Sequence, residues 1–265
     1  MLELKDINMI FNPATPDENR ALTGINLKIN RGDFITVIGS NGAGKSTLYN
    51  VIAGTLKPSS GKIYFNKDGT TPKDITAEPE YKRARYMGRI FQNPLLGTAG
   101  NMKLEDNMVI SSKKGNKGLK FTLNSKTREH FRQQLMQLNM GLENRLSDNV
   151  DQFSGGQRQA LTLLMAVMSR PDLLLLDEHT AALDPSNAEL IMNLTLKFTN
   201  EMGLTTMMVT HNRQHALDYG NRLLMMHKGQ IILDISGTEK TNLKMDDLIG
   251  RFKDLKINSD RMLLQ

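Results

Sequence analysis

The stretch GSNGAGKST (Gly39–Thr47) constrains the fold of this chain more than any other. It follows the apolar run DFITVIG (Asp33–Gly39), which predicts a buried strand. It leads into KSTLYNVIAGTL (Lys45–Leu56), whose apolar residues recur at helical spacing. A glycine inside a helix or strand costs roughly 0.5–1 kcal/mol, so this cluster predicts a loop. A glycine-rich loop between a strand and a helix indicates an α/β fold.

The spacing within the loop matches the pattern G-x-x-x-x-G-K-[ST]. In that pattern, backbone N–H groups and the helix N-terminus surround phosphate oxygens. Lys45 is expected to contact the β- and γ-phosphates, and the Ser46 hydroxyl to ligate Mg²⁺. The predicted nucleotide-binding residues of this loop are Gly39, Ser40, Asn41, Gly42, Ala43, Gly44, Lys45, Ser46 and Thr47. A flexible turn is the alternative, but the strand and helix on either side favour binding of a nucleoside triphosphate.

Composition limits the remaining function classes. The 265 residues are 39% apolar and 23% charged, which is typical of a globular protein. The absence of cysteine excludes disulfides and cysteine-ligated metals. The net charge of +6 is compatible with anionic partners, but 5% aromatic residues and no tryptophan make a poor base-stacking surface. We therefore expect no nucleic-acid partner.

No segment of the sequence predicts a membrane span. The charges at Glu3, Lys5 and Asp6 are unlike a secretory signal. The longest uncharged apolar stretch, ALTLLMAVM (Ala160–Met168), is far shorter than the roughly 20 residues that a spanning helix needs. The chain is not expected to cross a bilayer by itself.

Two kinds of strand pattern occur along the chain. Alternating residues in Leu2–Phe11, Leu22–Ile29 and Lys62–Phe65 predict an antiparallel layer. Short apolar runs separated by helical stretches predict a mostly parallel sheet covered on both faces. These runs are Asp33–Ile38, Met87–Phe91, Leu173–Leu176, Thr205–Val209 and Leu223–Met226. The segment from Asn93 to Gln152 has helix formers and polar loops, which indicates a mainly helical insertion.

Two carboxylates follow the buried strand in LLLLDEHT (Leu173–Thr180). Because side chains alternate along a strand, Asp177 and Glu178 point in different directions and can have different roles. Asp177 is suited to Mg²⁺, and Glu178 to orienting and deprotonating an attacking water. An acidic strand end without a role is the alternative, which the phosphate-binding loop in the same chain disfavours.

A second candidate anion site lies in FSGGQRQALTLLMAVM (Phe153–Met168). Ser154 is a favourable N-cap for a long apolar helix, and two glycines expose N–H groups at its positive end. The helical insertion separates this site from the phosphate-binding loop in sequence. The pattern therefore indicates a phosphate held by another subunit.

The order and spacing of four motifs resemble those of ATP-binding-cassette (ABC) transporter ATPase subunits. They are Gly39–Thr47, Ser154–Gln157, Asp177–Glu178 and VTHN at Val209–Asn212. The resemblance extends from Leu2 to about Ile235. It implies an α/β fold with a P-loop NTPase, RecA-like core, an antiparallel β layer and an inserted helical subdomain. It also implies hydrolysis of ATP, with Mg²⁺, to ADP and phosphate.

The resemblance also implies a domain organisation. We expect one ABC ATPase domain over 1–265, with a short tail that contains an amphipathic helix at Met245–Leu255. Its predicted parts are the α/β core with its β layer at 1–92 and 160–237, the helical subdomain at 93–159 and the tail at 238–265.

Further site residues are implied by the same resemblance. Phe11 matches the aromatic residue that stacks on adenine, with a strand-end core residue as the alternative. Gln92 matches the glutamine that contacts Mg²⁺ and the attacking water, and His211 the histidine that holds the γ-phosphate and supports Glu178. The segment Ala182–Asp184 matches a loop at the dimer interface. The residues implied to bind the partner's nucleotide are Ser154, Gly155, Gly156 and Gln157.

Four features depart from the usual family pattern. Phe153 replaces a leucine, His179 replaces a proline or small residue, and Asn212 replaces an aspartate. After Gln157, RQALTLLMAV lacks the arginine and small residues that the common family sequence QRVAIARAL has along the helix. None of these changes removes a catalytic group, and we interpret His179 as structural.

The resemblance implies that two copies close head to tail around two ATP molecules. The catalytic groups that it implies are Lys45, Gln92, Glu178 and His211. The metal ligands that it implies are Ser46, Gln92 and Asp177. The surface after Gln92 would contact separate permease subunits in the membrane, which places the chain at the cytoplasmic face of the cell membrane. FQNPLLGTAGNM and LDEHTAALDP resemble a bacterial importer subgroup for amino acids, tryptophan among them, with an extracellular substrate-binding lipoprotein.

An ABC exporter is the first alternative. A soluble ABC ATPase of DNA repair or translation is disfavoured because long heptad arms and a second cassette are absent from the sequence. A non-hydrolysing regulatory subunit is disfavoured because Glu178 and His211 are both present.

Overall fold

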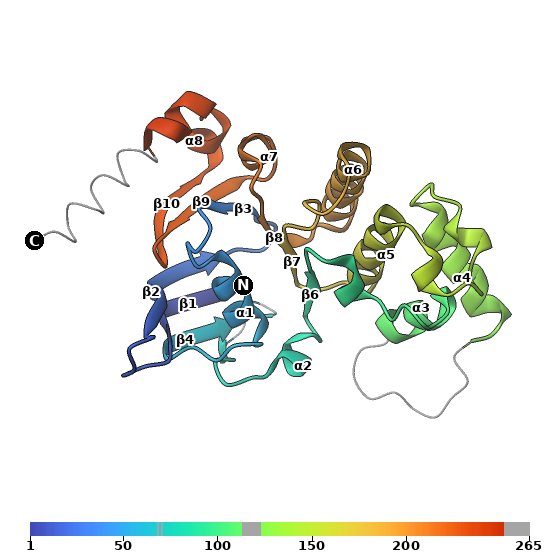
Figure 1. Ribbon diagram of the computed structural model, residues 1–265, viewed down its shortest axis with the longest axis horizontal. Coiled ribbons are helices and arrows are strands. Elements are labelled where there is room, and N and C mark those ends of the chain that lie inside the picture. Colours follow the sequence, from blue (N-terminus) through green and yellow to red (C-terminus); the bar gives the residue numbers. More distant parts are fainter. Residues whose placement is uncertain (68, 70, 113–122, 252–265) are drawn as a thin grey trace, which may run out of the picture. The chain divides into compact units, whose positions relative to one another are not determined.

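The computed structural model describes residues 1–67, 69, 71–112 and 123–251 (Figure 1). The chain forms two compact units. The first comprises Met1–Arg83 together with the chain from Thr205 onward, and the second comprises Ala84–Leu204.

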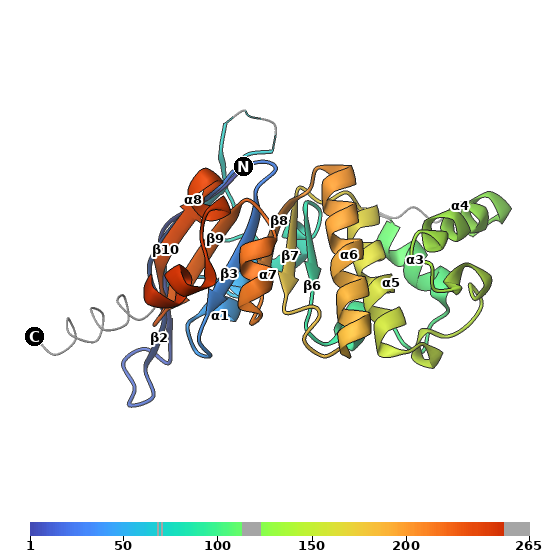
Figure 2. The ribbon, with the colours of Figure 1, turned by 90° about the horizontal axis from the view of Figure 1, so that it is seen from above.

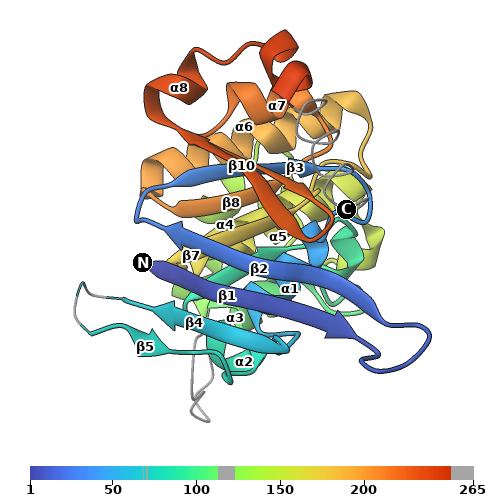
Figure 3. The ribbon, with the colours of Figure 1, turned by 90° about the vertical axis from the view of Figure 1, so that its left-hand side faces the viewer.

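An antiparallel sheet of the first unit has the strand order β2-β1-β4-β5 (Figure 3). Its strands are β1 (Leu2–Phe11), β2 (Asn19–Ile29), β4 (Ser60–Phe65) and β5 (Lys73–Asp74). Buried and more exposed residues alternate along most of β2 and β4, so each strand packs one face inward. The predicted antiparallel layer is confirmed, and the short strand β5 extends it.

The same unit contains four further strands in the order β10-β9-β3-β8. They are β3 (Phe34–Gly39), β8 (Thr205–Val209), β9 (Arg222–His227) and β10 (Gln230–Ser236). β3 pairs in parallel with β8 and β9, whereas β10 returns antiparallel beside β9. β3 and β8 are buried almost throughout, as expected for strands covered on both faces.

Short helices complete the first unit. They are α1 (Lys45–Ala53), α2 (Glu80–Arg83), α7 (Arg213–Asp218) and α8 (Gly237–Thr241), followed by a helical turn over 245–251. One apolar cluster joins Ile38, Ala216, Met225 and Leu248, so this last helical segment packs on the sheet. The predicted helix at Met245–Leu255 thus begins where expected, and its last four residues lie outside the described part of the chain.

The second unit combines two parallel strands with several helices. Its strands are β6 (Met87–Ile90) and β7 (Leu173–Asp177), paired in parallel from Met87 with Leu173 to Ile90 with Leu176. Its α-helices are α3 (Leu104–Ser112), α4 (Ser125–Met136), α5 (Gly155–Met168) and α6 (Pro185–Met202), and its 3₁₀ helices are Pro94–Gly97, Leu142–Asn144 and Val150–Gln152. α5 and α6 run side by side (Figure 2).

None of the helices in the described part of the chain combines the length and apolarity that a membrane crossing requires.

A buried arginine ties the end of α1 to the chain that follows the antiparallel sheet. The Arg83 side chain is 1% exposed. Its guanidinium donates hydrogen bonds of 2.6–3.2 Å to the carbonyls of Val51, Ile52, Ile75, Thr76 and Glu78. Val51 and Ile52 belong to the last turn of α1, where carbonyls lack partners within the helix and a cation is favoured.

Replacing this guanidinium should destabilise the protein. Arg83→Met is expected to lower the free energy of unfolding by about 3 kcal/mol, because several buried carbonyls lose their donor at once. Urea unfolding followed by circular dichroism measures this change. Arg85→Met, at an exposed position, is the matched control and should stay within about 0.5 kcal/mol of the wild type. Equal losses in the two variants would contradict the bonding role.

Candidate functional site

The phosphate-binding motif forms the loop between β3 and α1, as predicted. Lys45 is the first residue of α1 and is 6% exposed. Its Nζ donates hydrogen bonds to the carbonyl oxygens of Gly39, at 2.8 Å, and Ser40, at 3.1 Å. The ammonium group is thus folded back into the loop. Ser46, the predicted magnesium ligand, is exposed beside it.

Two glycines of the loop occupy positions that no other residue fits. Gly44 has a φ of +95°, and a Cβ atom there would lie 2.6 Å from the carbonyl oxygen of Ala21. A Cβ on Gly39 would lie 2.4 Å from the carbonyl oxygen of Met226. Because backbone atoms cannot move aside as side chains do, both positions need glycine. The neighbouring backbone therefore fixes the shape of the loop.

The register of two parallel strands brings His211 close to this loop. Val37 of β3 lies opposite Val209 of β8, and the Thr210 N–H donates to the Val37 carbonyl at 3.1 Å. Gly39, the last residue of β3, and His211, two residues after β8, each lie two positions beyond this pair, so both lie at the carboxyl edge of the sheet. This edge is where open α/β sheets bind ligands.

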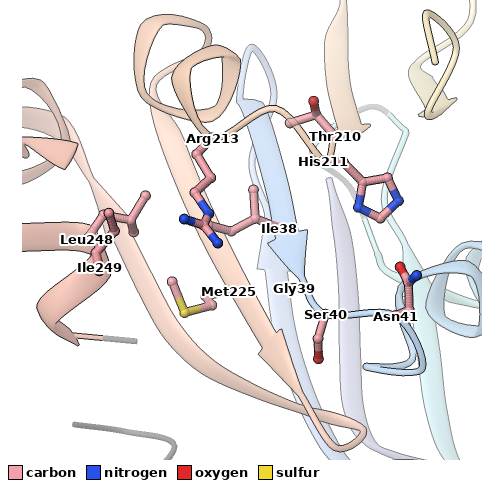
Figure 4. Close-up of a pocket in the computed structure, with 10 residues that line it drawn as sticks. All are labelled: Ile38, Gly39, Ser40, Asn41, Thr210, His211, Arg213, Met225, Leu248 and Ile249. Atoms are coloured by element: carbon pink, nitrogen blue, oxygen red, sulfur yellow. The ribbon is translucent and has the colours of Figure 1, made fainter. Parts of the chain in front are cut away.

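A pocket of about 620 Å³ opens at this edge (Figure 4). His211 and Asn41 lie on one side of it, while Arg213, Met225 and the helical segment with Leu248 lie on the other. The complete lining is Ile38, Gly39, Ser40, Asn41, Thr210, His211, Arg213, Met225, Leu248 and Ile249. The structure thus groups the start of the loop with His211.

Asn212 has a structural role that accounts for one departure from the family pattern. Its side-chain oxygen accepts hydrogen bonds from the N–H groups of Gln214, at 2.9 Å, and His215, at 3.2 Å. Asn212 is therefore the N-cap of α7. Asparagine and aspartate are about equally good at this position, so the substitution leaves the segment that carries His211 intact.

Phe11 is the last residue of β1 and lies opposite Asn19 of β2. Its side chain is half-buried, and the residues that follow it are exposed. This setting differs from that of the fully buried β1 residues such as Ile7. Stacking of Phe11 on adenine stays a prediction.

In the second unit, Gln92 and Asp177 line one pocket of about 390 Å³. Ile90 of β6 lies opposite Leu176 of β7, so Gln92, two residues after β6, and Asp177, the last residue of β7, both lie at the carboxyl ends of the paired strands. Phe91, Asn93, Pro94, Leu96 and Ala182 complete the lining. Ala182 comes from the segment predicted to reach a dimer interface. The pocket thus brings this segment next to the predicted metal ligands Gln92 and Asp177.

Arg89, which the sequence did not single out, lies beside the predicted metal ligand Asp177. Its guanidinium lies 3.8 Å from the Asp177 carboxylate and 4.5 Å from the centre of the Phe91 ring. Arg89 lies opposite Leu175, two residues before Asp177, so the strand register places both side chains on one face. The sequence holds one signal for this contact. If the strands that contain GRIF and LLLLD pair in this register, the alternation of side chains places Arg89 and Asp177 on the same face.

Glu178 follows β7 in a backbone conformation that is rare for glutamate. Its φ is +50°, in the left-handed region, where a residue other than glycine is held at a cost of about 1–3 kcal/mol. The N–H of Ala181 donates to its carbonyl at 2.9 Å and closes a turn. Glu178 thus turns sharply away from the direction of the strand.

The segment Ser154–Gln157 begins α5 as predicted. The Ser154 hydroxyl accepts the Gln157 N–H at 3.3 Å, and the Gln157 side chain accepts the Ser154 N–H at 3.1 Å. These two bonds form a capping box. A Cβ on Gly156 would lie 2.4 Å from the Asn187 side chain of α6, whereas Gly155 is exposed. Gly156 thus allows close helix packing, and Gly155 leaves the backbone of the first turn accessible.

The other departures fit this packing. Phe153 is 3% exposed, and the Arg145 guanidinium lies 4.5 Å from the centre of its ring. The apolar stretch after Gln157 is buried along α5. A phenylalanine in place of leucine is therefore accommodated in the core of this unit.

The predicted site residues fall into two groups. Lys45, Ser46 and His211 belong to the first unit. Gln92, Asp177, Glu178 and Ser154–Gln157 belong to the second. In the first group, Lys45 and Ser46 begin α1 and His211 follows β8. In the second, Gln92, Asp177 and Glu178 lie at the ends of β6 and β7, and Ser154–Gln157 begin α5.

Residues 22–181 match the protein family described as "ABC transporter", over more than half of the chain. The chain belongs to the ABC transporter family. It is 42% identical to the "Tyrosine transport ATP-binding protein" of Clostridioides difficile (strain R20291), across 96% of this chain and 99% of that relative.

Two solved structures share the fold of this ABC protein. One is cbiO1 from Clostridium perfringens, part of the ABC transporter complex cbiONQ, with a TM-score of 0.73 and 27% identity across 99% of this chain and 98% of that one. The other is a dimeric ATP-binding cassette in a post-hydrolysis state bound to ADP and Pi, with a TM-score of 0.72 and 25% identity across 89% and 98%. The predicted fold class is confirmed.

The family settles the basic activity. ABC cassettes bind ATP and hydrolyse it to power transport, and this chain is an ATPase of that family.

Proposed function

We propose that this chain is the ATP-hydrolysing subunit of a bacterial importer for an amino-acid-like solute. The observation that carries this proposal is its 42% identity, along almost the full length of both chains, to a protein named for tyrosine transport. The cargo contacts lie in other subunits, so the proposal names a substrate class on the basis of this similarity.

In the proposed reaction, water attacks the γ-phosphate in line with the leaving ADP. The phosphate loop and Lys45 hold the phosphates and neutralise the charge that develops on them. Glu178 accepts a proton from the attacking water. His211 contacts the γ-phosphate and keeps Glu178 in place, and Phe11 stacks on the adenine.

The candidate metal ligands suit Mg²⁺, which supplies further charge neutralisation at the phosphates when it is bound. Mg²⁺ prefers hard oxygen donors and is held by one or two carboxylates together with substrate phosphates. Asp177 offers a carboxylate and Gln92 an amide oxygen at one pocket, and Ser46 offers an exposed hydroxyl. Among the described residues, no group of three or more His, Cys, Asp or Glu side chains is arranged to hold a metal ion.

We further propose that two copies bind two ATP molecules head to tail. Ser154, Gly155, Gly156 and Gln157 of each copy would contact the γ-phosphate held by the other. The exposed N-terminus of α5 supports this assignment, because its N–H groups and helix dipole favour an anion. The similarity to a cassette solved as a dimer gives independent support.

The segment after Gln92 is the proposed contact with the membrane permease. Leu95 and Leu96, in the 3₁₀ helix Pro94–Gly97, are 53% and 66% exposed. Asn107 holds the following loop by accepting the Ala99 N–H at 2.8 Å and donating to the Lys103 carbonyl at 3.0 Å. Apolar side chains presented on a fixed loop suit docking to a permease at the cytoplasmic face of the membrane.

Transport in reconstituted vesicles tests the proposed function. The chain is assembled with candidate permease subunits in vesicles, with a candidate substrate-binding protein on the side opposite the ATPase. It should drive uptake of labelled tyrosine only when MgATP is on the ATPase side. Lys45→Ala should slow uptake by roughly a hundred-fold or more, because it removes a charge that stabilises the transition state.

Lys57→Ala, at an exposed lysine of the same unit, is the matched control and should transport normally. Efflux instead of uptake would identify an exporter. Uptake of another solute in place of tyrosine would contradict the substrate class and leave import intact.

A further inference from the structure

One buried glutamine links the two segments that carry Gln92 and Glu178. Gln159, on the second turn of α5, has no solvent exposure. Its Nε2 donates a hydrogen bond of 2.6 Å to the carbonyl of His179 and approaches the carbonyl of Phe91 at 3.5 Å. These carbonyls belong to the residues adjacent to Glu178 and Gln92 in the chain. One amide group therefore holds both backbone segments.

The Gln159 side chain is retained at an energetic cost. Its Oε1 is buried and has no hydrogen-bond partner within the part of the chain that the structure describes. A buried acceptor without a partner costs about 1–3 kcal/mol, which an apolar side chain of similar size would avoid. The two carbonyls also fix the orientation of the amide, because exchanging its N and O atoms would turn oxygen toward oxygen. The contribution of Gln159 is thus its donor group.

His179 anchors the same segment to α6. Its imidazole is 2% exposed, and its Nε2 lies 3.0 Å from the Thr195 hydroxyl oxygen. That hydroxyl donates its own proton to the Ile191 carbonyl at 2.8 Å. Nε2 must therefore carry a hydrogen and donate it to Thr195. Proline or a small residue, which is usual at this position in the family, could not form this bond.

These contacts surround the strained residue Glu178. Its left-handed backbone persists only where neighbouring structure holds it. The residue that follows it, His179, is held twice, through its carbonyl by Gln159 and through its imidazole by Thr195. The direction of the Glu178 carboxylate is therefore set by the segment that Gln159 and His179 secure.

We propose that Gln159 and His179 are positioning residues for ATP hydrolysis, a pair that we call the Gln159–His179 clasp. The clasp keeps the backbone beside Glu178 in register with the backbone beside Gln92. The side chains of Gln92 and Glu178 must act on the same water. A displacement of reacting groups by about 1 Å can lower the rate by up to a hundred-fold. This inference rests on the proposed roles of Gln92 and Glu178.

Steady-state hydrolysis by the full chain tests the clasp. Gln159→Leu and His179→Leu are expected to lower kcat by about ten-fold. The KM for ATP should stay within about two-fold of the wild type, because the phosphate loop and Phe11, the proposed ground-state contacts with ATP, are unchanged. His179→Gln carries a donor at a similar distance from the backbone and should restore kcat to within about three-fold of the wild type. Urea unfolding of each variant shows whether it remains folded.

Thr199→Val is the matched control on α6. The Thr199 hydroxyl is buried and donates to the Thr195 carbonyl at 2.8 Å, without contact to the clasp in the described hydrogen bonds. It should keep the wild-type kcat. Wild-type kcat in both leucine variants, or an equal fall in Thr199→Val, overturns the clasp. If Glu178→Gln hydrolyses ATP normally, the proposed role of Glu178 as the base fails and the clasp fails with it, whereas wild-type kcat in the leucine variants alone overturns only the clasp, so the two failures are distinguishable.

Discussion

Glu178→Gln is expected to bind ATP and to hydrolyse it roughly 10²- to 10⁴-fold more slowly than the wild type. The substitution keeps the size of the side chain and removes its capacity to accept a proton, and general-base catalysis contributes a factor of that order. Phosphate release at saturating ATP measures the effect. The melting temperature should still rise with MgATP, because the phosphate loop is unchanged; a ligand at 100 times its Kd contributes about 2.7 kcal/mol.

Glu189→Gln provides a matched control, because Glu189 is exposed on α6 only eleven positions further along the chain. Its turnover should equal that of the wild type. If Glu178→Gln lost less than about ten-fold in turnover, another group would have to accept the proton. If it no longer responded to MgATP, the substitution would have disturbed nucleotide binding, and Glu178 could not be assigned to the chemical step alone.

The sequence predicted the elements whose pattern is local. β1 was expected at Leu2–Phe11 and has those bounds, because buried and less buried residues alternate on either side of an irregularity at Lys5–Asp6 that does not end the strand. The phosphate loop was found because its glycines are needed at fixed spacing, and the structure gives the reason at Gly39 and Gly44. The start of α5 was found because Ser154 is a favourable N-cap before a long apolar run, and the structure adds a capping box with Gln157.

Contacts between distant residues could not be read from such patterns. Arg83 contacts the end of α1, some thirty residues away, and KRAR in the sequence looks like an exposed basic cluster. Gln159 contacts Phe91 and His179, and no local periodicity relates these three positions. His179 was interpreted as structural; the geometry gives it a defined partner in Thr195 and a place beside Glu178. Such residues become visible only once the strands and helices are assembled.

We expect dimerisation of this protein to depend on the γ-phosphate of ATP. In Glu178→Gln the γ-phosphate is not cleaved, so the closed dimer should accumulate with ATP and return to monomer with ADP, as expected when a ligand shifts a two-state equilibrium. Adding Ser154→Arg should abolish this dimer, because a bulky side chain replaces the small hydroxyl at the N-cap of α5 that is proposed to meet the partner's phosphate. Light scattering with ATP and with ADP measures the two states.

The Ser154→Arg protein should remain folded, because loss of an N-cap costs about 0.5–2 kcal/mol, less than the typical 5–15 kcal/mol stability of a domain. Ser125→Arg in the same background is the matched control, since it places the same cation on an exposed residue in the first turn of α4. That protein should dimerise with ATP. If Glu178→Gln stays monomeric in ATP, closure requires the membrane subunits. If Ser154→Arg dimerises as the control does, the start of α5 is not at the interface, because an arginine could not fit between a helix N-terminus and the phosphate that it binds.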